Sequence, residues 1–397
     1  MSGDNALTIK AWTPVRFVEL FAGIGLFRLG LEYVGPSWQC IMANDNSEMK
    51  TRAYRLNFVT AHLIEDDVAH TSAADIPPDT ELITASFPCQ DVSLAGNRVG
   101  LSGARTGNFY QFTRILEELV QAGRPPAQVL LENVTGLLSS HNGADIRSVL
   151  EALSALGYGL DILLLDAVHW LPQSRPRIFI VGRYGQGEHF VPFTLSLHPA
   201  RPTPIERVIH ANADLNWSFL ELPALPMRRQ QLADLVSTDV DGGFKGTELE
   251  RELSYIRGAS LTRLQKAQQA SAEDGQARHL AGYRRMRNNL VCLELRDDGL
   301  AGCLRTATGG SSRQLLVEVT PNQTSIRYMT PREYARLMGL PETFALPTNT
   351  REALTCLGDA VAVPVIRWLG QVLEAQAAPH HAHAPELAPA LSAALAG

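Results

Sequence analysis

The chain has 397 residues, of which 45% are hydrophobic and 19% are charged, and its formal net charge is −6. This length is enough for two domains with a large core, and the composition is ordinary for a globular protein. The sequence shows no apolar run near the ~18 residues of a membrane span, and residues 1–14 lack the basic and apolar blocks of a signal peptide, so we expect no membrane association.

The five cysteines are scattered and odd in number, which favours a reduced, cytoplasmic setting over a disulfide framework. No Cys or His cluster has zinc-ligand spacing, so we expect no metal site. The acidic net charge mildly disfavours a nucleic-acid partner, because phosphate binding depends on Lys and Arg. Net charge does not describe how the charges are distributed, however.

Strand-like and helix-like segments alternate from residue 15 to about residue 183. Strands are predicted at 15–21, 38–43, 81–85, 128–131, 158–168 and 178–181. Helices are predicted at 26–34, at 109–122 and at 146–156, and a further helix follows the second strand and ends at residue 54. This alternation is typical of a doubly wound α/β fold, in which helices cover both faces of a parallel sheet.

The alternating pattern is lost between about residues 190 and 325, which predicts a second, smaller and irregular domain. Regular structure resumes at Thr330, where Thr330 and Glu333 have the spacing of a capping box. The expected parts of the chain are an N-terminal extension at 1–13, a large domain at 14–190 plus 327–376, a small domain at 191–326 and a disordered tail at 377–397.

Pro88-Cys89-Gln90 follows the apolar segment 82–85. The proline ends the strand and places Cys89 in a loop at a strand's carboxyl end, where ligands bind in open α/β sheets. A thiol there is a candidate nucleophile. Taken alone, these residues favour an inert core cysteine, which is the commoner fate of an isolated Cys.

Glycines and acids follow the first three predicted strands. The turn 21–25, Phe-Ala-Gly-Ile-Gly, would let the backbone approach a ligand closely. Asp45-Asn46 follows the second strand, where an acid commonly holds ribose hydroxyls. Asp67-Val68 would end a third strand that precedes the one at 81–85, where a carboxylate can accept from an adenine amine. Each could be a cap or turn residue, but together they predict a nucleoside cofactor.

Charged side chains also flank two later strands. Glu132 follows the strand at 128–131, and a carboxyl desolvated in a cleft keeps its proton and can donate a hydrogen bond. Arg175 and Arg177 precede the strand at 178–181 and, at i and i+2 of an extended chain, point the same way. The alternatives are a helix N-terminus for Glu132 and a charged sheet edge for the arginines.

A dense basic cluster lies in the irregular region. It spans Tyr283 to Asn289, contains Arg284, Arg285 and Arg287, and is followed by Arg296, Arg305 and Arg313. From these residues alone, a solvated surface with salt bridges is at least as good an interpretation as a nucleic-acid contact.

Taken in the order in which they occur along the chain, several of these segments resemble the motifs of the DNA cytosine-5 methyltransferases. The resemblance is strongest to the bacterial modification enzymes of restriction–modification systems. The resemblance covers about 15–183 and 328–370. The matching segments are 17–25, Phe87-Pro88-Cys89-Gln90, 96–101 with Arg105, 132–134, Gln173-x-Arg175-x-Arg177, 330–341 and 358–365. The sequence departs from the family at Leu26 and Ser86, where Gly is usual, and at Asp359, where Asn is usual.

The resemblance implies a Rossmann-like methyltransferase domain with an inserted target-recognition domain, in which 304–310 resembles a recognition loop. It implies a catalytic set in which Cys89 attacks C6 of a flipped cytosine, Glu132 bonds its N3 edge, and Arg175 and Arg177 hold its O2 side and a phosphate. It implies S-adenosyl-L-methionine as cofactor, held by Phe21, Gly23, Gly25, Asp45, Asn46, Asp67, Val68 and Asp359. It implies duplex DNA contacts from Gln90, Ser93, Arg98, Arg105, Arg284, Arg285, Arg287, Arg305 and Thr306.

We further expect a monomer on DNA in the bacterial cytoplasm, associated with the nucleoid, and a cognate restriction enzyme that acts separately. The alternatives are an RNA cytosine-5 methyltransferase, a non-catalytic DNA-binding regulator and a Rossmann dehydrogenase. The large 190–325 region favours duplex DNA over RNA. The complete set of Cys89, Glu132 and the two arginines argues against a regulator, and the incomplete glycine pattern argues against a dehydrogenase.

Overall fold

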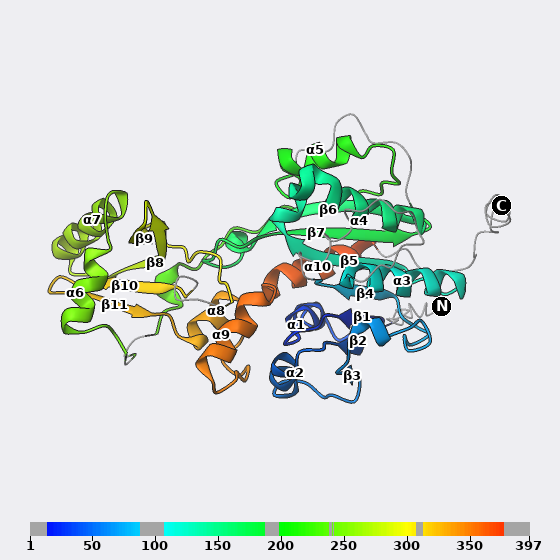
Figure 1. Ribbon diagram of the computed structural model, residues 1–397, viewed down its shortest axis with the longest axis horizontal. Coiled ribbons are helices and arrows are strands. Elements are labelled where there is room, and N and C mark those ends of the chain that lie inside the picture. The colour runs from blue at the N-terminus through cyan, green and yellow to red at the C-terminus, as the bar shows by residue number, and fades with distance from the viewer. Residues whose placement is uncertain are drawn as a thin grey trace, which may run out of the picture.

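The computed structural model describes residues 14–87, 107–186, 198–237, 240, 242–306 and 313–376. Figure 1 shows a larger α/β part and a smaller part that extends from one side of it. The larger part contains both the N-terminal strands and the last helices of the described chain, so the smaller part is an insertion between them.

A seven-stranded sheet of order β3-β2-β1-β4-β5-β7-β6 forms the centre of the larger part. Its strands are β1 (Val15–Leu20), β2 (Trp38–Asn44), β3 (Leu63–Ile64), β4 (Leu82–Ala85), β5 (Gln128–Val134), β6 (Tyr158–Asp166) and β7 (Pro176–Tyr184). The first five are parallel, whereas β7 runs antiparallel to both β5 and β6. The α/β expectation is confirmed, but the sheet is mixed, because the connection 167–175 is shorter than the dozen or so residues of a parallel crossover.

The larger part contains eight described helices, and helices pack on both faces of its sheet. They are α1 (Leu26–Glu32), α2 (Glu48–Arg55), α3 (Asn108–Gln121), α4 (Ala144–Ala155), α5 (Thr203–Ala211), α8 (Pro331–Leu337), α9 (Thr350–Asp359) and α10 (Val363–Gln376). Alternate residues of β1 enter two cores: Phe17 packs with α1 and α10, and Val18 packs with α3 and α4. This alternation is what a strand buried on both faces requires.

The stretch 198–220 packs on the larger sheet, although it lies inside the range 191–326 that the sequence suggested for the small domain. Residues 216–218 pair with the edge strand β6 through Leu160. Arg201 forms an ion pair with the fully buried Asp161 of β6. The chain therefore leaves the larger part only after this stretch.

The smaller part is built on a four-stranded antiparallel sheet of order β11-β10-β8-β9. Its elements are α6 (Gly246–Ser254), α7 (Ala259–Asp274), β8 (Arg278–Arg287), β9 (Leu290–Arg296), β10 (Leu315–Val319) and β11 (Thr324–Tyr328). The prediction of an irregular region was wrong here. The strand β8 carries five polar or charged side chains and a glycine among its ten residues, so its sequence looks like a basic loop.

Two predictions at the C-terminal side have clear outcomes. The capping box of α8 is confirmed, since Thr330 Oγ1 accepts from the Glu333 N–H and the Glu333 carboxylate accepts from the Thr330 N–H. The stretch Thr350–Gln376 is long and apolar enough to cross a membrane, but 72% of its apolar window is buried inside the protein. It therefore belongs to the core.

Candidate active site and nucleic-acid interface

A cavity of about 280 Å³ lies at the carboxyl ends of the parallel strands. Its walls come from the turn after β1, from Ser86 and Phe87 after β4, from Glu132 to Val134 at the end of β5, and from Arg177 of β7. The strand β1 is where the strand order reverses direction, with β2 on one side and β4 on the other. Such a switch point is where open α/β sheets bind their ligands.

Glu132 and Arg177 form an ion pair in this cavity, with 3.0 Å between Arg177 Nε and Glu132 Oε1. Glu132 is buried, and burial raises the pKa of its carboxyl, an effect that the Arg177 guanidinium opposes. The pair therefore combines a desolvated carboxyl that can retain a proton with a fixed cation beside it.

Arg175 has different surroundings from Arg177. Its guanidinium donates to the carbonyl oxygens of Leu304 at 2.9 Å, Gly358 at 3.0 Å and Ala360 at 2.5 Å. It is 2% exposed and is not among the residues that line the cavity, and burial lowers its pKa to about 10. The two arginines do extend toward a common neighbour, the Cys303 sulfur, but only Arg177 reaches the cavity.

The predicted nucleophile lies outside the described residues, as do Gln90, Ser93, Arg98 and Arg105. Cys89 follows Phe87 by two residues in the sequence, and Phe87 is held in the cavity wall. The Asn133 side-chain amide donates to the Phe87 carbonyl oxygen at 2.9 Å, so the end of β5 fixes the start of this loop.

The predicted cofactor residues fall into two groups. Phe21, Gly23 and Asp359 line the cavity, and Phe21 and Gly23 both have a φ of +59°, which the tight turn requires. The second group does not line it and consists of Gly25, Asp45, Asn46, Asp67 and Val68.

Members of the second group fix the backbone around the turn. The Asp45 carboxylate accepts from the N–H groups of Gly23 and Ser47, both at 2.8 Å. Asp67 accepts from the Ala69 N–H at 2.9 Å as the cap of a short 3₁₀ helix. Asp45 and Asp67 therefore act as the turn and cap residues that the sequence offered as an alternative. Their contact with a nucleoside stays a prediction.

Sequence reasoning missed four polar residues in the cavity wall: Glu19, Lys50, Ser86 and Asn133. Glu19 Oε1 accepts from the Arg28 N–H, whereas Oε2 has no hydrogen-bond partner in the described part of the chain. Burial raises the pKa of Glu19 to about 8. A charged residue inside the buried strand β1 was a signal that could have identified it, whereas Lys50 belongs to no recognisable motif.

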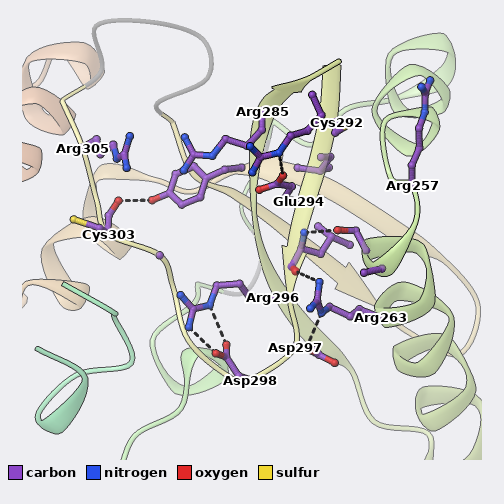
Figure 2. A pocket seen from close by; sticks show the side chains of 17 residues that line it. Arg257, Arg263, Arg285, Cys292, Glu294, Arg296, Asp297, Asp298, Cys303 and Arg305 are labelled. Atoms are coloured by element: carbon purple, nitrogen blue, oxygen red, sulfur yellow. Dashed lines mark hydrogen bonds and ion pairs between the residues drawn. The ribbon is translucent and has the colours of Figure 1, made fainter. Parts of the chain in front are cut away.

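A second hollow of about 670 Å³ lies on the smaller part, between β8, β9 and the start of α7 (Figure 2). Six arginines and three carboxylates line it, in a chain whose net charge is negative. The lining arginines are Arg257, Arg263, Arg285, Arg287, Arg296 and Arg305. This surface is therefore locally basic.

Three of these arginines are neutralised by neighbouring acids. Arg263 is 3.3 Å from Asp297 and Arg296 is 2.6 Å from Asp298 (Figure 2), and Arg287 is 2.6 Å from Glu294. Within the described ranges, no carboxylate lies at ion-pair distance from Arg285 or Arg305. Arg285 instead lies over the ring of Tyr283, 5.0 Å from its centroid.

The remaining predicted DNA contacts are placed as follows. Arg284 does not line the hollow, because it alternates with Arg285 along β8 and its guanidinium is 2.7 Å from the buried carboxylate of Glu252. The backbone of Arg305 and Thr306 packs directly on Gly358, where an added Cβ would lie 2.3 Å from the Arg305 carbonyl carbon. A residue that lines the hollow, Arg305, therefore packs against a residue of the cavity wall, Gly358.

A switch-point cavity with an acid–arginine pair, together with a basic insertion, defines an α/β enzyme with a surface suited to nucleic acid. The chain belongs to the C-5 cytosine-specific DNA methylase family, which matches residues 15–375.

Known relatives and structures agree with this assignment. Type II methyltransferase M.HpaII of Haemophilus parainfluenzae is 27% identical over 371 residues, which cover 89% of this chain and 88% of that protein. M.HhaI of Haemophilus parahaemolyticus is 26% identical over 367 residues, covering 91% and 94%. The structure of S. pombe Dnmt2 methyltransferase has the same fold, with a TM-score of 0.55, 19% identity and coverage of 92% and 99%. The predicted family and methyltransferase fold are confirmed.

Proposed function

We propose that this chain transfers a methyl group from S-adenosylmethionine to C5 of a cytosine in a specific duplex DNA sequence, as the modification enzyme of a restriction–modification system. The Glu132–Arg177 pair in the switch-point cavity carries the proposal. A basic hollow on the same molecule supplies a surface for the DNA. The enzyme would act as a monomer on DNA in the bacterial cytoplasm, and a cognate nuclease would act separately.

The cavity wall fits a positively charged cofactor. Within the described residues, one oxygen of the buried Glu19 has no partner and is available to a cationic group, and Phe21 adds an aromatic residue to the same cavity wall. When bound, S-adenosylmethionine supplies an electrophilic methyl group on its sulfonium. Asp45 would fix the glycine turn and leave the cavity open for the ligand.

The target cytosine must leave the duplex stack to reach a buried acid, so base flipping is part of the proposal. The Cys89 thiolate would form a bond to C6 and make C5 nucleophilic. Glu132, whose pKa is raised by burial, would donate its carboxyl proton in a hydrogen bond to N3 and stabilise the electron-rich ring. After C5 takes the methyl group, loss of the C5 proton, for which water is a suitable acceptor, and breakage of the sulfur–C6 bond release the base.

The two arginines would have separate tasks. Arg177 lines the cavity beside Glu132 and would hold the O2 side of the base. Arg175 holds three backbone carbonyls from two segments and would act as a positioning residue. This division differs from the sequence expectation, in which both arginines met the substrate.

Cells that express the wild-type chain or Cys89→Ser test this proposal by bisulfite sequencing of their DNA. We expect methylated cytosine at one sequence context with the wild type and none with the variant, which should still bind cofactor and DNA. Tritiated methyl transfer to duplex DNA and to tRNA separates the DNA from the RNA alternative. Full methylation by Cys89→Ser, or transfer to tRNA alone, would contradict the proposal.

A further inference from the structure

A groove of about 640 Å³ lies beside the connection between β6 and β7, and it shares no lining residue with the cavity or with the basic hollow. Six of its nine lining residues are apolar: Val168, Pro199, Ala224, Leu225, Pro226 and Met227. Leu225 packs against the main core, whereas Met227 is 90% exposed. The described part of the chain therefore leaves an apolar surface uncovered here, and such a surface commonly marks a docking site.

The wall of this groove is held in place by the protein itself. His198 Nε2 donates to the Pro223 carbonyl oxygen at 3.0 Å, and its Nδ1 accepts from the Ala200 N–H at 3.1 Å. Both ring nitrogens thus fix the start of the wall segment 224–228 against the stretch 198–220. A preformed groove spares its ligand the cost of ordering the wall.

The C-terminal end of α10 lies next to the groove. Gln376 Oε1 accepts from the Glu221 N–H at 2.9 Å, and Gln376 Nε2 donates to the Glu221 carbonyl oxygen at 2.8 Å. Ala224 and Arg228 of the groove wall follow Glu221 along the chain, at no more than about 11 Å and about 25 Å of extended chain. The C-terminal tail, residues 377–397, continues from Gln376 and lies outside the described residues.

The sequence of the C-terminal tail has the features that this groove requires. Leu387, Leu391 and Leu395 recur at every fourth residue, a spacing that places them on one face of a helix. Four of the six residues between them are Ala, the strongest helix former. Glu386 is the single acidic residue of the tail, and Arg228 lines the groove with no carboxylate of the described residues at ion-pair distance. This pattern favours docking of the last twelve residues over the disorder expected for the whole tail.

We propose that residues 386–397 of the same chain dock in this groove as a short helix, with the three leucines against its apolar wall and Glu386 beside Arg228. Pro389 stands in the first turn of this helix, where a proline is tolerated. The nine residues before this segment span up to about 30 Å when extended, which is enough to reach the whole wall. Because Val168 lines the groove, the docked segment also braces the β6–β7 connection from outside.

Oxidation of methionine by hydrogen peroxide tests the proposal on the full chain, and its outcome does not depend on the proposed function. Peptide mass spectrometry gives the rate of sulfoxide formation at Met227 and at Met286, a reference that is 61% exposed and does not line the groove. A tethered segment meets its groove at an effective concentration on the order of 1 mM, so an intrinsic dissociation constant of about 0.1 mM protects Met227 about 10-fold. We expect Leu391→Asp to raise the rate at Met227 by this factor and to leave the rate at Met286 unchanged.

Ser392→Asp is the matched control, because it adds the same charge one residue away and off the leucine face. It should retain the protection of Met227. Equal rates at Met227 in the wild type and in Leu391→Asp, or the same acceleration in Ser392→Asp, would overturn the proposal. Loss of protection on dilution of the wild-type chain would also overturn it, because the tail of a second copy would then fill the groove.

Discussion

The Arg177 guanidinium lies 3.0 Å from the Glu132 carboxylate, on a strand that runs antiparallel to the one carrying Glu132. Because β7 reverses direction, its N-terminal end meets the carboxyl end of β5, and Val134 pairs in register with Arg177. A parallel β7 would have placed its opposite end at this edge of the sheet. The mixed topology therefore brings an acid and a guanidinium into one cavity.

Glu132→Gln should slow methyl transfer by a factor on the order of 10²–10⁴, as expected for lost acid–base assistance. Burial raises the pKa of Glu132, so its carboxyl keeps the proton to higher pH than an exposed glutamate. The wild-type rate should fall as the pH rises through that raised pKa, because the required proton is lost. The glutamine carries permanent N–H donors, so a single-turnover pH profile of the variant should lack this fall.

Glu151→Gln is the control, since it removes an exposed carboxylate from α4 that does not line the cavity. It should retain the wild-type rate and pH profile. An unchanged rate in Glu132→Gln, or the same fall at high pH, would remove Glu132 from the mechanism.

Local patterns in the sequence were sufficient for most strands of the larger sheet. The apolar residues of β1 and β5 indicate that these strands are buried. The glycine at position 23 indicates a backbone turn with a positive φ. Each of these properties can be recognised from the residue types of a short segment. The direction of β7 is not a local property, although the short connection before it could have indicated a hairpin.

The site could be predicted where a residue lies at the end of a strand or in a motif that resembles the family's. Glu132 does so, whereas Lys50 reaches the cavity from a helix and meets Asp359 far away in the sequence. Arg284 and Arg285 look equivalent in the sequence, but they alternate across β8, so one meets Glu252 and the other faces the hollow. Such pairings depend on tertiary packing that residue spacing does not encode.

Arg175→Lys should destabilise the protein more than Arg177→Lys. The Arg175 guanidinium holds three carbonyl oxygens at once, and a lysine ammonium cannot span the same positions with its single nitrogen. The loss leaves buried carbonyls unpaired, at about 1–3 kcal/mol each. Thermal unfolding should show a lower midpoint for Arg175→Lys, whereas Arg177→Lys should mainly lower kcat. Equal midpoints would contradict the positioning role.

Asp161→Asn should lower the free energy of unfolding by about 3–5 kcal/mol, because it leaves the buried Arg201 without its counter-charge. Asp161 is 0% exposed, Arg201 is 4% exposed, and the Asp161 carboxylate also accepts from the Leu220 N–H at 2.9 Å. Urea unfolding measures the change. Asp214→Asn removes a well-exposed partner of Arg147 and should leave the urea midpoint unchanged; a comparable loss in both variants would contradict the argument.

Arg285→Ala should weaken binding to the cognate DNA sequence far more than Arg287→Ala. Both arginines lie on β8 and line the same hollow, but Arg287 is neutralised by Glu294 at 2.6 Å, whereas Arg285 is available to a ligand. A free guanidinium in such a hollow suits the O6 and N7 acceptors of guanine, and a bidentate contact of this kind is worth about 1–3 kcal/mol of discrimination.

Fluorescence anisotropy with duplexes changed at one base pair at a time measures this effect. With the cognate duplex, Arg285→Ala should lose about 5- to 150-fold in affinity, the range equivalent to 1–3 kcal/mol, and should tolerate replacement of one guanine that the wild type requires. Arg287→Ala should keep the wild-type base preference at every position. If both variants lose affinity equally on all duplexes, Arg285 contacts phosphate rather than a base, because phosphate contacts carry no sequence information.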